Sequence, residues 1–231
     1  MQPFNELEYG QFYHIYNHGV GGRDLFLEPE NYEYFLGLYN KYISPIAETY
    51  AWCLMPNHFH MLVRIKDNVV YKYSNADGSI DAVRFKEAKW QTVESNLTAS
   101  EGPVSVEENK IKIPQPHLHF SHLFNAYSKY LNSRFETRGA LFERPFQRKL
   151  IDNLIYRKEV VVYIHCNPIH HGFCTHPVEY PWSSYLTCAS DKATKLKRDE
   201  VISWFSGKNE YEEWHKKKTD MHKMDWELGV D

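Results

Sequence analysis

The sequence predicts an α+β fold in which an antiparallel sheet carries helices and one further helix follows it. The 231 residues are 42% hydrophobic and 16% aromatic, which supplies one buried core with additions. Apolar residues recur at alternating or helical spacing in the order strand, helix, hairpin, helix, strand. That order is the βαββαβ arrangement of split βαβ, or ferredoxin-like, folds, which we call the palm.

The first half of the chain predicts a strand, a helix and a two-stranded hairpin. Residues 11–17 are rich in aromatic side chains and predict the first strand. Pro29 is placed to begin a helix whose apolar residues recur at helical spacing. Residues 48–55 and 58–65 predict two strands, and the Pro-Asn pair between them is typical of a tight turn.

The middle of the chain changes character and then returns to regular patterns. Residues 66–116 are polar and charged, so we expect an insertion or arm without regular structure there. Residues 117–138 predict a helix that Gly139 ends. Residues 141–151 predict the fourth strand, in which a proline indicates a sheet edge or a bulge.

The last part of the chain predicts two more helices. Asn153 is suited to cap the first of them, and Pro168 is expected to end it. A second helix is predicted within 198–218. We therefore expect a main domain over residues 1–175 and a C-terminal extension over 176–231.

Charge and cysteine content narrow the class of protein only a little. The net charge is −3 and the pI about 6.5, whereas dedicated nucleic-acid binders are often strongly basic. The four cysteines form no C-x-x-C pair. No hydrophobic signal core begins the chain, and no apolar run approaches the roughly 20 residues of a membrane helix. We expect a soluble protein of a reducing, cytoplasmic compartment with no membrane partner.

Two histidines in the third predicted strand are candidate metal ligands. His58 and His60 are two residues apart, so their side chains point to the same face of the strand. Two imidazoles with room for oxygen ligands suit a divalent metal with open positions. The alternative is two ordinary histidines on a half-exposed face. His117 and His119 share the spacing but lie at an expected helix start, so we interpret them as ordinary residues.

Tyr163 and Asn167 form a second candidate pair on the helix after the fourth strand. They are four residues apart and therefore share one helical face. The amide oxygen can act as a metal ligand beside the phenol, and a phenol with a pKa near 10 needs such help to act as a nucleophile. The alternative is one packed tyrosine among 17 and a helix-ending Asn-Pro pair.

A basic stretch is the third candidate feature. Eight basic and three acidic residues lie between Lys129 and Lys158. Phosphates require such charge for affinity, although an ordinary solvated face explains it equally well. Phe142 and Phe146 could stack on bases, but we expect both to pack in the core. The candidate DNA-binding residues are Arg134, Arg138, Arg144, Arg148 and Lys149.

Taken together and in this order, these segments resemble IS200-like single-tyrosine HUH transposases, most closely the REP-associated tyrosine transposase branch. Leu54–Val63 is similar to the HUH motif region, and Tyr163–Pro168 with His171-Gly172 is similar to the helix that carries the catalytic tyrosine. Further similar segments are Tyr13–Asn17, Leu141–Arg148 and Trp182–Tyr185. The 66–116 segment is longer than the resemblance implies, and the net acidity is unusual for it.

The resemblance implies a function and a set of roles. His58, His60 and Asn167 would hold a magnesium or manganese ion, and Tyr163 would attack a phosphodiester of single-stranded DNA near a hairpin. A 5′-phosphotyrosine and a free 3′-hydroxyl would result, without any nucleotide cofactor. The resemblance also makes 1–175 the catalytic domain of a nucleoid-associated monomer or homodimer.

Three other functions remain open on the sequence alone. The first is a domesticated descendant that binds single-stranded or hairpin DNA without moving it. The second is a zinc hydrolase in which Tyr163 is structural. The third is an interaction module that binds no divalent metal.

Overall fold

The computed structural model describes residues 6–67, 69–72, 89–92 and 111–217. The elements of the palm are β1 (Phe12–His18), α1 (Pro29–Tyr42), β2 (Ala47–Met55), β3 (His58–Ile65), α2 (Pro116–Arg134) and β7 (Gln147–Leu150). Their strands form one sheet in the order β2-β3-β1-β7, and every neighbouring pair is antiparallel. The predicted βαββαβ fold is therefore confirmed, with the first strand between the third and the fourth.

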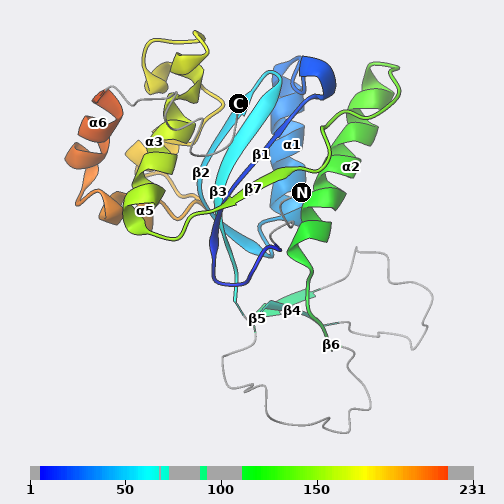
Figure 1. Cartoon of the computed structure of the whole chain (residues 1–231), viewed down its shortest axis with the longest axis horizontal. Helices are drawn as coiled ribbons and strands as arrows, with labels where there is room; N and C mark the ends of the chain where they lie inside the picture. The colour runs from blue at the N-terminus through cyan, green and yellow to red at the C-terminus, as the bar shows by residue number, and fades with distance from the viewer. Residues whose placement is uncertain (1–5, 68, 73–88, 93–110, 218–231) are drawn as a thin grey trace, which may run out of the picture.

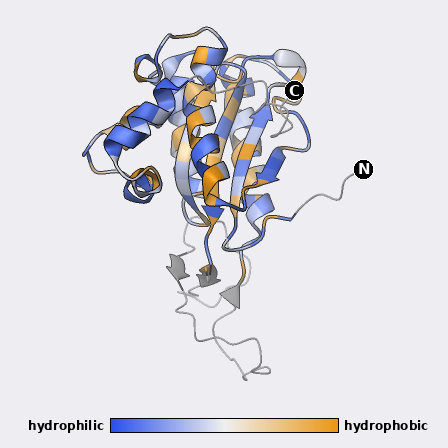
Figure 2. Cartoon of the chain, turned by 60° about the vertical axis from the view of Figure 1, so that its left-hand side comes forward, coloured by the Kyte–Doolittle hydropathy of each residue, from blue (hydrophilic) through white to orange (hydrophobic). Residues whose placement is uncertain are grey.

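Helices cover both faces of this sheet (Figure 1). One face packs against α1 and α2, and the other against α3 (Leu154–His170) and the helices that follow it. The later elements are η2 (Pro177–Glu179), α4 (Tyr185–Ala189), α5 (Arg198–Trp204) and α6 (Lys208–Lys216). Hydrophobic residues concentrate along the sheet, whereas the peripheral segments are mainly hydrophilic (Figure 2).

The α1/α2 face holds a core built from the apolar residues that alternate along β3. Phe59 and Met61 are fully buried there, against Phe35 of α1 and Tyr127 of α2. The aromatic side chains of the basic stretch also contribute, because the buried Phe142 and the partly buried Phe146 both pack against Phe124 of α2. Their predicted core role is confirmed.

The other face is covered by α3 and the C-terminal segment. Cys53 of β2 and Leu62 of β3 are buried against α3 and against aromatic residues of the last helices. The outer edge of β2 is also occupied, since Trp52 and Leu54 exchange backbone hydrogen bonds with Ser184 and Trp182 at 2.9 Å. The C-terminal segment thus shares a core with the palm, and the boundary predicted at residue 175 remains a prediction.

Several element ends differ from the predictions. The side chain of Asn153 accepts from the Tyr156 N–H and caps α3 as predicted, but α3 continues through Pro168. A proline removes only one N–H, and the next backbone bond, from His171 to Asn167, is kept at 3.1 Å. The predicted helix within 198–218 is two helices, because Gly207 has φ 128° between them.

The predicted strand 141–151 and the predicted helix 117–138 are shorter than expected, and the predicted insertion 66–116 contains regular structure. β7 begins at Gln147, and Phe142 forms only an isolated bridge with Gly19. α2 ends at Arg134, so Arg138 lies in the following loop. Within the predicted insertion, β4 (Val69–Lys72), β5 (Lys89–Thr92) and β6 (Ile111–Lys112) form a small antiparallel sheet, and the rest of 66–116 that joins these strands is largely outside the described residues. η1 (Val20–Gly22) follows β1.

Candidate active site

His58 and His60 lie on β3, on the sheet face that α3 covers. The register pairs His18 of β1 with His58 and Tyr16 with His60, so β1 presents side chains to the same face. His58 is 3% and His60 0% exposed. The alternative of a half-exposed histidine face is therefore wrong, because α3 shields this part of the sheet from solvent.

α3 brings Tyr163 and Asn167 to these histidines. Each is 1% exposed, and the Asn167 Oδ1 atom lies 3.0 Å from Nε2 of His58. The Tyr163 ring stands nearly perpendicular to the His60 ring, with 5.4 Å between centroids. The two pairs, which lie about 100 positions apart in the sequence, are therefore close together in the structure.

Burial keeps the imidazoles of this site neutral. The pKa of His58 is lowered to about 4, mainly by desolvation; the hydrogen bond with Asn167 opposes the shift, and the nearby His18 and His171 add to it. Desolvation also lowers the pKa of His60 well below its ordinary value. A neutral imidazole retains a lone pair, which is the form that binds a metal.

The surroundings of His58 fit a divalent cation. Its Nδ1 lies 2.7 Å from Oδ1 of Asn57 and its Nε2 lies 3.0 Å from Oδ1 of Asn167. A neutral imidazole has one N–H, so it donates to only one of these two oxygens and turns a lone pair toward the other. A divalent ion held by Nε2 of His58 and Oδ1 of Asn167 would accept a lone pair from each atom and so would remove the repulsion between them.

His60 offers a second nitrogen that could bind a metal. Its Nε2 atom is buried without a hydrogen-bond partner, and its Nδ1 lies 3.0 Å from Nε2 of His14. Among the described residues, no group of three or more His, Cys, Asp or Glu side chains is placed to hold a metal ion. The donor set that fits is therefore the two imidazoles with the Asn167 amide.

Three further histidines surround this site, and the sequence analysis gave none of them a role in it. The His14 ring lies 5.1 Å from the His60 ring, His18 stacks on His58 at 5.0 Å, and His171 lies 4.9 Å from His58. His14 is buried, whereas His171 is exposed and His18 is half-buried at the rim. Alternation along β1 places His14 and His18 on one face, but only the pairing with β3 shows that this face is the one with His58.

The candidate DNA-binding residues are not gathered into one patch. In β7, Lys149 pairs with His14 and Arg148 with Ile15, so their side chains point to opposite faces of the sheet. Arg134 lies at the end of α2 and forms an ion pair with Glu28. Arg138 and Arg144 are exposed in the segment that leads to β7.

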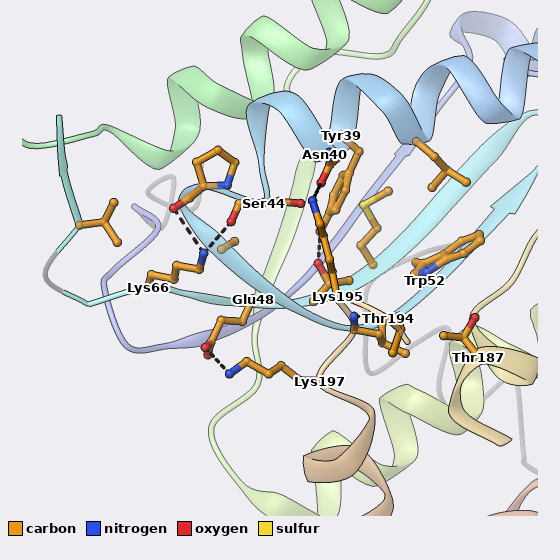
Figure 3. A pocket seen from close by; sticks show the side chains of 17 residues that line it. Tyr39, Asn40, Ser44, Glu48, Trp52, Lys66, Thr187, Thr194, Lys195 and Lys197 are labelled. Atoms are coloured by element: carbon orange, nitrogen blue, oxygen red, sulfur yellow. Dashed lines mark hydrogen bonds and ion pairs between the residues drawn. The ribbon is translucent and has the colours of Figure 1, made fainter. Parts of the chain in front are cut away.

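A cavity of about 750 Å³ lies away from this site (Figure 3). Its lining comes mainly from the second half of α1, from β2, from Met61 of β3 and from the segment before α5. Its three lysines are engaged: Lys66 contacts the Ser44 carbonyl, Lys195 the Asn40 amide oxygen and Lys197 the Glu48 carboxylate. Among the described residues that line it, none is a predicted site residue.

The fold of this chain is similar to that of a known tyrosine transposase. Among solved structures, the chain is similar to the REP-associated tyrosine transposase bound to a REP hairpin, with a TM-score of 0.50 and 13% identity. The similarity covers 83% of this chain and 86% of that chain. The resemblance stated from the sequence is thereby confirmed at the level of the fold.

Other comparisons add no family. No protein-family model matches the sequence, and no curated protein matches it significantly. Among the described residues, no helix has both the length and the apolar content to cross a membrane.

Proposed function

We propose that this protein is a metal-dependent enzyme that nicks and rejoins single-stranded DNA at hairpins through a covalent bond to Tyr163. The observation that carries the proposal is the convergence of Tyr163 and Asn167 from α3 with His58 and His60 from β3. The similar fold of a transposase bound to a DNA hairpin supports the choice of substrate.

Each residue has a chemical role in this proposal. His58, His60 and Asn167 would hold a magnesium or manganese ion, and a bound ion would supply polarisation of the scissile phosphate. The Tyr163 oxygen attacks the phosphorus, the bond to the 3′-oxygen breaks, and the phenol proton ends on the 3′-hydroxyl. The phosphotyrosine conserves the bond energy, so a second 3′-hydroxyl rejoins the strand by the reverse step.

The burial of Tyr163 favours one competing function. At 1% exposure the phenol is not presented to solvent, so DNA reaches it only after the side chain rotates or the surrounding segment moves. A descendant that binds hairpins without cutting them does not need such a movement. Formation of a covalent adduct separates the two functions, because a binder forms none.

The decisive experiment incubates labelled single-stranded hairpins of varied flanking sequence with the full chain and Mn²⁺. A labelled protein band on a denaturing gel is expected for the wild type and absent for Tyr163→Phe. Tyr127→Phe is the matched control, because Tyr127 is equally buried but lies on the α1/α2 face with its hydroxyl on the Leu25 carbonyl. An adduct that persists in Tyr163→Phe rules out the proposed nucleophile, and a wild type that binds hairpins without an adduct supports the binder.

A further inference from the structure

His14 lies at the centre of the buried site although it is not among the proposed metal ligands. It belongs to β1, is completely buried, and its Nε2 lies 3.0 Å from Nδ1 of His60. The two rings are nearly parallel, and the Tyr163 ring stands edge-on to His14 with 5.9 Å between centroids. His14 therefore contacts a proposed ligand directly and adjoins the proposed nucleophile.

The hydrogen-bonding capacity of this pair is only half used. Nδ1 of His14 and Nε2 of His60 are both buried without a hydrogen-bond partner, and they lie at the two outer ends of the pair. Each neutral ring has one N–H, so the shared bond has two possible directions. The direction decides whether Nε2 of His60 carries a hydrogen or a lone pair.

We propose that His14 is a positioning residue that accepts a hydrogen bond from Nδ1–H of His60 and so keeps a lone pair on Nε2 of His60 for the metal. This inference rests on the metal site of the proposed function. Histidines that bind metals commonly donate their second ring N–H to an acceptor, which fixes both the tautomer and the ring orientation. Here the acceptor is an uncharged imidazole.

The packing around His14 keeps solvent away from its contact with His60. Its neighbours on the same face are the ring of Tyr16, stacked at 5.0 Å, and the ring of Tyr163. Because His14 and His60 are both completely buried, solvent does not reach Nδ1 of His60 to replace the acceptor. Loss of the His14 ring nitrogen therefore frees His60 to adopt either tautomer and to tilt.

The first test measures Mn²⁺ affinity by calorimetry on the full chain. His14→Phe keeps an aromatic ring but removes the acceptor, and the affinity should fall about 10- to 100-fold. His14→Gln restores an acceptor oxygen and should recover most of the affinity. His119→Phe is the matched control, since His119 is a buried histidine of α2 that is hydrogen-bonded to the Tyr42 carbonyl of α1, and it should leave the affinity unchanged.

Thermal denaturation of each variant checks that it is folded, and nitrogen NMR supplies a direct readout of the tautomer. In the Mg²⁺-bound wild type, His60 should be the Nδ1–H form. An Nε2–H form, or equal affinities of folded wild type and folded His14→Phe, overturns the inference. If His14→Phe does not fold, His14→Gln carries the test: an altered His60 tautomer with Mg²⁺ bound overturns it.

The outcome also separates this inference from the proposed function. If the wild type binds Mn²⁺ and His60→Ala does not, the metal site stands, and the His14 variants decide the positioning role alone. If the wild type binds no Mn²⁺ or Mg²⁺, the metal site and the positioning role both fail.

Discussion

The two faces of the central sheet bury side chains of different character, and β3 contributes to both. Toward α1 and α2 it buries Phe59 and Met61, and polar groups there such as the Tyr127 hydroxyl have partners. Toward α3 the same strand buries His58 and His60, with an unpartnered nitrogen on His60. Leaving a buried polar group unsatisfied costs about 1–3 kcal/mol. The unpartnered nitrogen on the α3 face therefore lowers the stability of the fold, whereas the α1/α2 face has no such cost at the Tyr127 hydroxyl; local destabilisation of this kind is common at functional sites.

The largest expected effect is on cleavage, and it comes from substituting one at a time two neighbouring residues of β3 that face opposite sides of the sheet. His60→Leu removes the open nitrogen, so metal-dependent cleavage should fall at least about 100-fold, since a metal contributes several kcal/mol and each 1.36 kcal/mol is tenfold in rate. The free energy of unfolding should change little, because the unsatisfied Nε2 of His60 is lost while the buried Nε2 of His14 loses its partner.

Phe59→Leu is the partner variant and should show the opposite pattern. It should lower the free energy of unfolding by about 1–3 kcal/mol through lost packing. Cleavage per folded molecule should remain near the wild-type rate. Urea denaturation measures the free energy of unfolding, and single-turnover assays measure cleavage. Cleavage at the wild-type rate by His60→Leu would contradict the assignment of the chemistry to the α3 face.

A second prediction concerns acid, because the α3 face is rich in buried neutral histidines. Burial lowers the pKa of His14 to about 3 and those of His58 and His215 to about 4. In the unfolded chain each titrates near 6.5, so the unfolded state binds more protons between pH 6.5 and the folded pKa. The contribution of these neutral histidines to the free energy of unfolding is therefore intact above pH 6.5 and is lost as the pH falls toward 4.

The expected size follows from the same values. Each such histidine should cost about 1.4 kcal/mol of stability at pH 5.5 relative to pH 7.5 in metal-free protein. His215→Leu should reduce the loss by that amount, although His215 lies outside the proposed site and contacts His165 at 3.0 Å. Urea denaturation at the two pH values measures the difference, and a loss that is identical in wild type and variant would contradict it.

The fold and the inner site were predictable where the pattern is local. Alternation along β3 gives the shared face of His58 and His60, and helical spacing gives that of Tyr163 and Asn167. Neither pattern contains the register between strands, which depends on residues far apart in the chain. His14 was missed for this reason.

The ends of elements and the outer surface were less predictable. Pro168 remains inside α3 because the last turn loses one N–H and keeps the next bond. Arg148 and Lys149 are adjacent in the sequence and were grouped as one basic surface, but a strand turns adjacent side chains to opposite faces. The sequence shows how many basic residues the stretch contains, but the face on which each side chain lies depends on how the strand pairs in the sheet.

The smallest effect should distinguish the basic residues by the face they occupy. Lys149 is exposed and shares the register position of His14, next to the proposed site, whereas Arg134 pairs with Glu28 in the layer on the other side of the sheet. Lys149→Ala should lower the slope of log binding constant against log salt by about 0.7 for single-stranded DNA, the value for one lost phosphate contact. Arg134→Ala should leave the slope unchanged. Fluorescence anisotropy with a labelled hairpin over a salt series measures both, and a flatter slope in Arg134→Ala alone would place the DNA on the α1/α2 side.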